Sequence, residues 1–220
     1  KGAAEDPEML RTALPLAILI GSADAFASSA FAGSALSSRL RGGSSAGLRQ
    51  ASSSSGVHMA LKVGDTLPTG VELSVREDGK MLSFKTEELF KGKRSVIFAV
   101  PGAFTPTCSE QHLPGFVEKN AELTKAGAEV VACVSVNDPF VMREWGIAQK
   151  VDGKVKMLAD GNGAFSTAIG QIVDKGAAMG MRSNRYAMVL DKDMKVEALM
   201  LEDGGFGETS AEKVLEFLKK

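Results

Sequence analysis

Hydrophobic residues within positions 61–220 follow two patterns, continuous runs typical of buried strands and spaced positions typical of helices. Two runs are apolar almost without interruption, as parallel strands buried on both faces are. Each is followed by a stretch in which apolar residues recur every three or four positions, which predicts a helix. The elements predicted here are strands at 94–100 and 128–136, helices at about 106–125 and 139–149, and a strand at 155–158.

Shorter patterns flank this βαβα unit on both sides. They predict a hairpin at 71–84, a helical turn at 86–90, strands at 185–191 and 195–201, and a final helix that begins with a capping box at 209–212. The order is βαβα, a β-hairpin and a helix, with an extra N-terminal hairpin. It predicts an α/β protein of the thioredoxin-like fold, with a central mixed sheet flanked by helices.

The first 58 residues have a different character. Residues 13–20 form an apolar run behind Arg11 that is too short to span a bilayer, and Ala-Phe-Ala follows at 25–27. From 25 to 64 there is no Asp or Glu, whereas Ser is abundant. This composition is typical of a signal peptide followed by a transit peptide, the two-part address of plastids acquired by secondary endosymbiosis.

We therefore expect a disordered targeting presequence over residues 1–58 and one domain over residues 59–220. Two alternatives are a plain disordered tail and upstream sequence before a true start at Met59. The expected location is the plastid, with the mitochondrion as an alternative, or the cytosol if translation starts at Met59. The mature form is not expected to enter a membrane.

Charge and cysteine content exclude several classes of function. The net charge of −1 provides no basic field for nucleic acid or anionic lipid. The two cysteines, Cys108 and Cys133, form no Cys-x-x-Cys pair, and two histidines are too few to suggest a structural zinc site. Since there is also no glycine-rich nucleotide loop, we expect no metal and no cofactor, and redox chemistry would rest on these thiols and an outside reductant.

Cys108 stands where a predicted strand passes into a predicted helix. The strand at 94–100 ends at a Pro-Gly pair and Pro106 opens the helix, so Cys108 falls in the first turn. Free N–H groups and the helix dipole there favour a thiolate. An ordinary cysteine is only about 3% ionised at pH 7, and raising this to about 90% takes about 3.4 kcal/mol. Because a helix N-terminus supplies at most about 2 kcal/mol, a nearby cation is required.

His112 lies one helical turn after Cys108 on the same face of the predicted helix. A Cys–His pair of nucleophile and base would suggest a cysteine hydrolase or transferase. Such pairs usually join distant segments, so packing or a backbone hydrogen bond is the preferred interpretation of His112. Trp145 is interpreted as a residue on the core face of its helix.

The chain resembles the type II, peroxiredoxin-5-like peroxiredoxins of plants, on blocks that extend over residues 61–220. The first block is Pro-Gly-Ala-Phe-Thr-Pro-Thr-Cys-Ser at 101–109, and the others lie at 112–116, 135–142, 145–146, 158–160 and 182–186. The resemblance implies a thiol peroxidase in which Cys108 attacks a hydroperoxide and becomes a sulfenic acid. Hydrogen peroxide and alkyl hydroperoxides would be the substrates, and the protein would serve cell redox homeostasis.

The resemblance also assigns roles to four residues around Cys108. The family's active-site arginine corresponds to Arg185, and Arg182 is a second candidate that would hold a loop or a carboxylate. Thr105 would hydrogen-bond the thiolate and the peroxide, and its position also predicts a helix N-cap. Pro101, which ends the strand, would shield the sulfur from water.

Cys133 has two interpretations. Its apolar neighbours in a predicted strand indicate an inert core thiol. Its position 25 residues after Cys108 matches the second cysteine of the plant-type enzymes, which is often treated as the resolving cysteine. A disulfide between the two would require local unwinding of the helix.

Because no cysteine follows Cys133 in the chain, direct reduction by glutathione and glutaredoxin, or by thioredoxin, is favoured. A monomer or a homodimer is expected. The alternative function is a peroxide sensor or redox relay with little turnover of its own.

Overall fold

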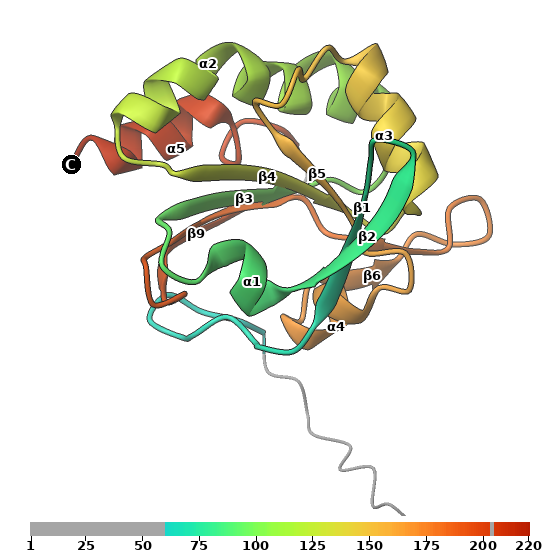
Figure 1. Ribbon diagram of the computed structural model, residues 1–220, viewed down its shortest axis with the longest axis horizontal. Coiled ribbons are helices and arrows are strands. Elements are labelled where there is room, and N and C mark those ends of the chain that lie inside the picture. Colours follow the sequence, from blue (N-terminus) through green and yellow to red (C-terminus); the bar gives the residue numbers. More distant parts are fainter. Residues whose placement is uncertain (1–59, 203–204) are drawn as a thin grey trace, which may run out of the picture. The chain divides into compact units, whose positions relative to one another are not determined.

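The strand β3, Ser95–Ala99, turns alternate side chains into two hydrophobic layers. Val96 and Phe98 belong to one buried cluster, while Ile97 and Ala99 belong to another on the opposite face. In the computed structural model of the protein, which describes residues 60–202 and 205–220, β3 lies inside a seven-stranded mixed sheet (Figure 1).

The sheet has the strand order β2-β1-β5-β4-β3-β8-β9. Its strands are β1 Glu72–Glu77, β2 Lys80–Lys85, β3, β4 Val130–Ser135, β5 Lys156–Ala159, β8 Tyr186–Leu190 and β9 Val196–Leu201. The middle strands β5, β4 and β3 are parallel, whereas β8, β9, β1 and β2 join antiparallel. A separate antiparallel pair consists of β6 Ile172–Asp174 and β7 Met181–Ser183.

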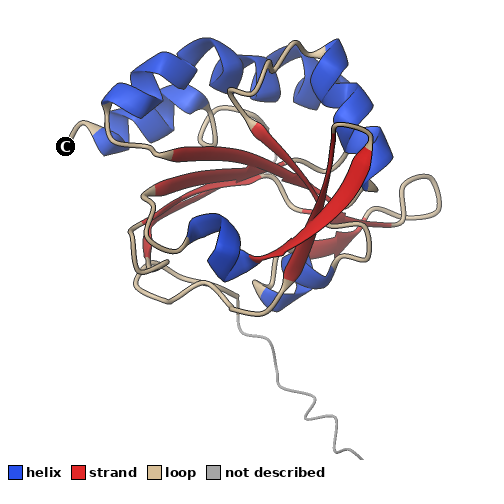
Figure 2. Cartoon of the chain, viewed as in Figure 1, coloured by secondary structure: helices blue, strands red, loops and turns tan. Residues whose placement is uncertain are grey.

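Helices cover both faces of the sheet (Figure 2). They are α1 Thr86–Phe90, the π-helix η1 Cys108–His112, α2 Leu113–Lys125, α3 Pro139–Ala148, α4 Ala164–Ala168 and α5 Ala211–Leu218. Buried residues of α2, α3 and α5 share one cluster, in which Phe98 stacks on Phe116 with 3.9 Å between ring centroids. The turns α1 and α4 supply Phe90 and Phe165 to the other cluster.

The predicted thioredoxin-like α/β fold is confirmed, with both hairpins and the parallel strands where the pattern indicated them. The short elements α4, β6 and β7 were not predicted. Short elements carry a weak hydrophobic pattern, and these three were missed although α1 and β5, of similar length, were predicted.

The helix predicted at 106–125 differs at its start. Over Cys108–His112 it is a π-helix, and the N–H of Leu113 donates to the carbonyl of Cys108, five residues back. Pro114 gives the physical reason, because it has no N–H to donate and its ring crowds the carbonyl four residues earlier. The helix therefore widens just before the proline.

The capping box predicted at 209–212 was wrong by one residue. The N-cap of α5 is Ser210, whose hydroxyl accepts a hydrogen bond from the N–H of Lys213. The Thr209 hydroxyl instead donates to Glu202, a partner that local spacing cannot reveal.

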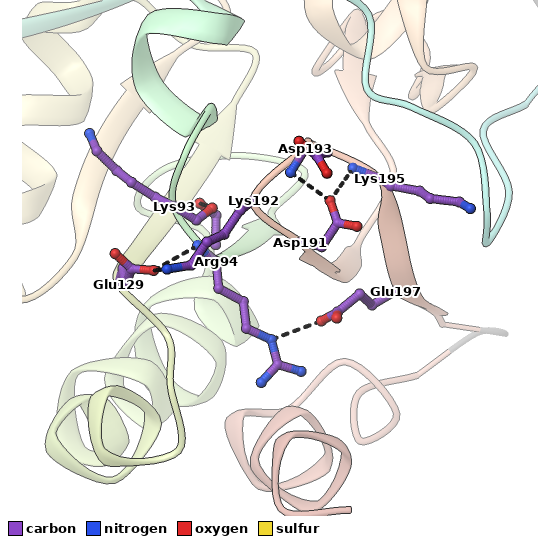
Figure 3. A network of polar contacts seen from close by, with 9 residues as sticks. Lys93, Arg94, Glu129, Asp191, Lys192, Asp193, Lys195 and Glu197 are labelled. Atoms are coloured by element: carbon purple, nitrogen blue, oxygen red, sulfur yellow. Dashed lines mark hydrogen bonds and ion pairs between the residues drawn. The ribbon is translucent and has the colours of Figure 1, made fainter.

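An ion-pair network joins three segments at the end of β3 opposite Cys108 (Figure 3). Glu129 accepts from the Arg94 N–H and pairs with Lys192 at 3.2 Å, while Arg94 Nε pairs with Glu197 at 2.8 Å. The pKa of the Glu129 carboxyl is lowered below its usual value. The main cause is the hydrogen bond from the Arg94 N–H, and the next is the hydrogen bond from the Lys192 side chain. These contacts tie the starts of β3 and β4 to the β8–β9 hairpin.

The presequence expected over residues 1–58 lies outside the described residues, so its structure stays a prediction. Within residues 60–202 and 205–220, none of the helices has the length and hydrophobicity needed to cross a bilayer.

Candidate active site

Cys108 is the first residue of η1, just beyond the carboxyl end of β3, and only 1% of its surface is exposed. The loop that leads to it is held by Asn137, whose Oδ1 accepts from the N–H of Ala103 at 3.0 Å and from the Ser135 hydroxyl at 2.7 Å. Strand ends that meet at one edge of the sheet thus position the thiol. Asn137 lies two residues after the end of β4, within the 135–142 block, but its role in the loop was not foreseen.

The structure places Arg185, the arginine expected beside Cys108, in contact with the sulfur. It precedes β8, which pairs with β3, and its Nη2 donates to Cys108 Sγ at 3.5 Å. The guanidinium is thus placed to interact with negative charge on the sulfur. The aromatic ring of Phe206 lies 5.8 Å from the guanidinium carbon on another side.

His112 fixes the orientation of this guanidinium. Its Nε2 lies 3.0 Å from the Thr209 carbonyl oxygen, and its Nδ1 lies 3.0 Å from Arg185 Nη1. A carbonyl only accepts and a guanidinium only donates, so Nε2 carries the proton and Nδ1 accepts. Burial, together with the charge of Arg185, lowers the pKa of His112 to about 3, so the ring is neutral. Neither ring nitrogen is free to act as a base for Cys108, which argues against the Cys–His alternative.

Glu202 anchors the segment that holds His112. Its Oε1 accepts three hydrogen bonds, from the Thr209 hydroxyl at 2.7 Å, the Thr209 N–H at 2.8 Å and the Gly207 N–H at 2.9 Å. These contacts fix the Thr209 carbonyl that binds His112. Sequence reasoning missed Glu202 because no local motif distinguishes it from a surface carboxylate.

The Thr105 hydroxyl does not cap the helix, and this prediction was wrong. Instead it donates to the carbonyl oxygen of Gly102 at 2.9 Å. The turn that contains Thr105 is unusual, since Phe104 before it has a φ of 61° and exposes 57% of its surface. With its hydroxyl turned back onto the turn, Thr105 stabilises the loop rather than the first helical N–H groups.

Arg182 contacts the backbone and not the sulfur. Its Nε donates to the carbonyl of Met179 at 2.8 Å and its Nη1 donates to the carbonyl of Val136 at 3.0 Å. It therefore ties the β6–β7 loop to the segment after β4. This geometry corresponds to the loop-holding role among the alternatives considered for Arg182.

Cys133 lies within β4, fully buried, with Phe98 as its register partner on β3. Burial raises the pKa of the Cys133 thiol well above its usual value, and the charge of the neighbouring Cys108 adds a smaller effect in the same direction. Both cysteines are free thiols in the same hydrophobic cluster. A protonated thiol in this environment is a weak nucleophile.

Trp145 is buried on the core face of α3, as expected, and has a further contact that was not foreseen. Its Nε1 donates to the hydroxyl of Ser109, the residue after Cys108, at 3.0 Å. This bond ties α3 to η1.

A pocket of about 550 Å³ opens onto the site. Pro101, Thr107, Gln111, Arg185 and Phe206 are among the residues that line it. Among the described residues, no group of three or more His, Cys, Asp or Glu side chains is placed to hold a metal ion. The arrangement thus presents a sulfur nucleophile and a fixed cation beside a polar pocket, which suits attack on a small polar electrophile.

Comparisons with known proteins agree with this geometry. Residues 62–215 match the family model described as Redoxin. The chain is 47% identical to the chloroplastic peroxiredoxin-2E-2 of Oryza sativa subsp. japonica over 165 residues, which cover 72% of each protein. It is 42% identical to peroxiredoxin-2B of Arabidopsis thaliana over 160 residues, which cover 72% of this chain and 98% of the relative.

Solved structures lead to the same group. Reduced Prx3 of Vibrio vulnificus in complex with hydrogen peroxide matches with a TM-score of 0.69 and 43% identity, covering 72% of this chain and 99% of the other. Peroxiredoxin 5 of Alvinella pompejana matches with a TM-score of 0.64 and 32% identity, covering 72% and 98%. A buried cysteine beside an arginine, on this fold and with these relatives, identifies the chain as a member of the Redoxin family and, within it, a type II peroxiredoxin, a thiol-dependent peroxidase.

Proposed function

We propose that Cys108 is the peroxidatic nucleophile of this peroxidase, acting on hydrogen peroxide and alkyl hydroperoxides. The thiolate attacks the terminal oxygen, so an S–O bond forms as the O–O bond breaks. The leaving oxygen takes up a proton and departs as water or an alcohol, and the cysteine becomes a sulfenic acid. The observation that carries this assignment is the 3.5 Å contact between Arg185 Nη2 and Cys108 Sγ.

Three neighbours serve the same step in this proposal. Arg185 stabilises the thiolate and the negative charge that develops on the leaving oxygen. Thr105 turns its hydroxyl from Gly102 to the peroxide, while Pro101, on the wall of the pocket, limits the access of water to the sulfur.

The sulfenic acid is then reduced by glutathione and glutaredoxin, or by thioredoxin, with Cys133 as an inert core thiol. The burial of Cys133 and its raised pKa favour this route over an internal disulfide. Since Cys108 is itself buried, η1 must open for the reductant thiol to reach the sulfur. The protein acts as a monomer or a homodimer.

The test replaces Cys108 with serine, which is nearly isosteric but not ionised at neutral pH. Cys108→Ser should keep its circular dichroism spectrum and lose peroxidase activity, with Cys133→Ser as the matched control that retains most of it. Wild-type turnover in Cys108→Ser would remove this residue from the nucleophile role. Poor turnover of the wild type with every thiol donor would instead favour the peroxide sensor or relay.

We further propose that residues 1–58 direct the protein to the plastid. Two relatives that support this carry chloroplastic names, from Oryza sativa and Arabidopsis thaliana. A fluorescent fusion of residues 1–60 should reach the plastid of an algal host with a secondary plastid. Accumulation of the fusion in the mitochondrion would show that the presequence directs the protein there instead. Retention in the cytosol would favour a translation start at Met59.

A further inference from the structure

A second pocket, of about 480 Å³, lies on the side of α3 that faces β1 and β5. Figure 1 shows these three elements side by side, and they are in contact. The pocket shares no lining residue with the one beside Cys108. Its lining includes apolar residues from all three elements, Val75 of β1, Ile147 of α3 and Met157 of β5.

The floor of this pocket is close-packed where α3 crosses β5. A side-chain carbon at Gly146 would lie 3.0 Å from Met157 Cγ and 3.3 Å from Val151 Cγ2, so glycine allows the helix to approach. At the mouth, Ile147 leaves 56% of its surface exposed. An apolar floor and an exposed apolar edge favour a hydrocarbon ligand.

Three cations are among the residues that line the pocket: Arg76, Arg143 and Lys156. The guanidinium of Arg76 lies 4.7 Å from the ring centroid of Phe140 and forms no ion pair with any described residue. The other two are held in exposed pairs, Arg143 with Glu144 and Lys156 with Glu77 at 3.7 Å, and such pairs exchange partners at little cost.

The acidic side chains on the lining are Glu77 and Asp152, and Glu77 already pairs with Lys156. The lining therefore has three positive and two negative groups. Arg76 in particular is a planar donor whose fork matches a carboxylate.

We propose that this pocket binds a free medium-chain fatty acid. The hydrocarbon chain lies along Val75, Ile147 and Met157, and the carboxylate pairs with Arg76 and Arg143. The site is separate from the peroxidase centre and does not depend on the assignment of Cys108.

Decanoate is the probe, titrated below its micelle-forming concentration into the full-length protein. Trp145 is the only tryptophan of the chain and is adjacent to Gly146 on the pocket lining. Its fluorescence should change with saturation, and calorimetry should give the dissociation constant. Decanol, which has the same chain without the charge, should bind at least about tenfold more weakly, since a charge-assisted pair is worth about that factor or more.

Two variants test the two halves of the site by calorimetry. Arg76→Gln should weaken decanoate binding about tenfold, and Ile147→Glu should abolish it. The matched controls are Lys91→Gln and Val63→Glu, which change an exposed cation and an apolar residue of 60% exposure elsewhere. Peroxidase activity of each variant shows that it is folded. Absence of saturable binding, equal binding of decanol, or wild-type affinity in both pocket variants would overturn the proposal.

Discussion

The guanidinium of Arg185 is divided between two partners, Cys108 Sγ through Nη2 and His112 Nδ1 through Nη1. The sequence predicted the cation, because a helix start alone stabilises a thiolate too weakly. The sequence did not predict which residue orients the guanidinium of Arg185. His112 was foreseen only as a packed or backbone-bonded ring, and its contact with Thr209 fits that interpretation.

The first prediction compares the two arginines of the site. Arg185→Met should slow the reaction of the reduced protein with hydrogen peroxide about ten- to hundredfold, since a hydrogen bond to a charged group is worth about 1.5–3 kcal/mol. Arg182→Met removes only contacts to carbonyl oxygens and should cost less than about fivefold. Single-turnover kinetics at pH 7 measure both, and equal slowing would show that the wrong arginine has been assigned.

The second prediction concerns acid stability. The pKa of His112 falls from 6.5 in the unfolded chain to about 3 in the folded protein, so between these values only the unfolded chain takes up the proton. The folded protein should therefore lose about 1.4 kcal/mol of unfolding free energy for each pH unit below about 6.5. The effect is absent above pH 7 and complete near pH 3.

His112→Gln is the comparison for this experiment, with urea unfolding measured from pH 7 to pH 4. Burial raises the pKa of Asp160, which gives a stability change of opposite sign, but this group is present in both proteins. The difference between the two curves isolates His112. Parallel curves would mean that the ring is protonated in the folded protein.

At the scale of elements, hydrophobic patterns predicted where helices and strands lie better than they predicted the detailed geometry of each element. Alternation and continuous apolar runs located the long strands, since burial of a whole strand leaves a clear pattern. The π-helix at Cys108–His112 was not predicted, although Pro114, which causes it, can be read in the sequence. A period of 3.6 residues cannot show that a helix widens for a single turn.

The third prediction belongs to β4 and its buried Cys133. Cys133→Ala should keep most glutaredoxin-dependent turnover and lower the unfolding free energy by about 1–2 kcal/mol, because the missing sulfur leaves a small cavity. Turnover assays and urea unfolding measure the two effects. A stoichiometric Cys108–Cys133 disulfide in a non-reducing peptide map, or oxidation to sulfinic acid at lower peroxide doses, would show instead that Cys133 resolves.

At the scale of the molecule, the site is assembled from segments far apart in sequence. Periodicity predicts each segment but not which side chains meet, because that depends on strand order and on a loop without a motif. Arg185 was identified through the resemblance, whereas Glu202 and its contact with Thr209 had no signal of either kind. The sequence therefore indicated Cys108 and Arg185, which the structure brings into contact, but not the groups that hold them in place.

The fourth prediction is that residues 1–58 are dispensable for catalysis. The family match begins at residue 62, and Leu61 already bonds to the domain through its N–H, which donates to the carbonyl of Ile169. A protein that starts at Met59 should retain the wild-type kcat/KM and melting temperature within about twofold and 2 °C.

Deletion through Pro68 is the control for this experiment. It removes Leu67, which is 1% exposed and whose N–H donates to the Met194 carbonyl, so it should lower the melting temperature by several degrees. A large loss of activity on the shorter deletion would show that the presequence takes part in the enzyme.

The distance along the chain between the thiol and its supports has a consequence for biosynthesis. Arg185 follows Cys108 by 77 residues, and Thr209 follows His112 by 97. During translation, Cys108 leaves the ribosome well before either of these residues. The thiol of the growing chain has no guanidinium beside it until β8 pairs with β3. Under the proposed function, the reactivity of Cys108 toward peroxide therefore arises only once the fold is complete.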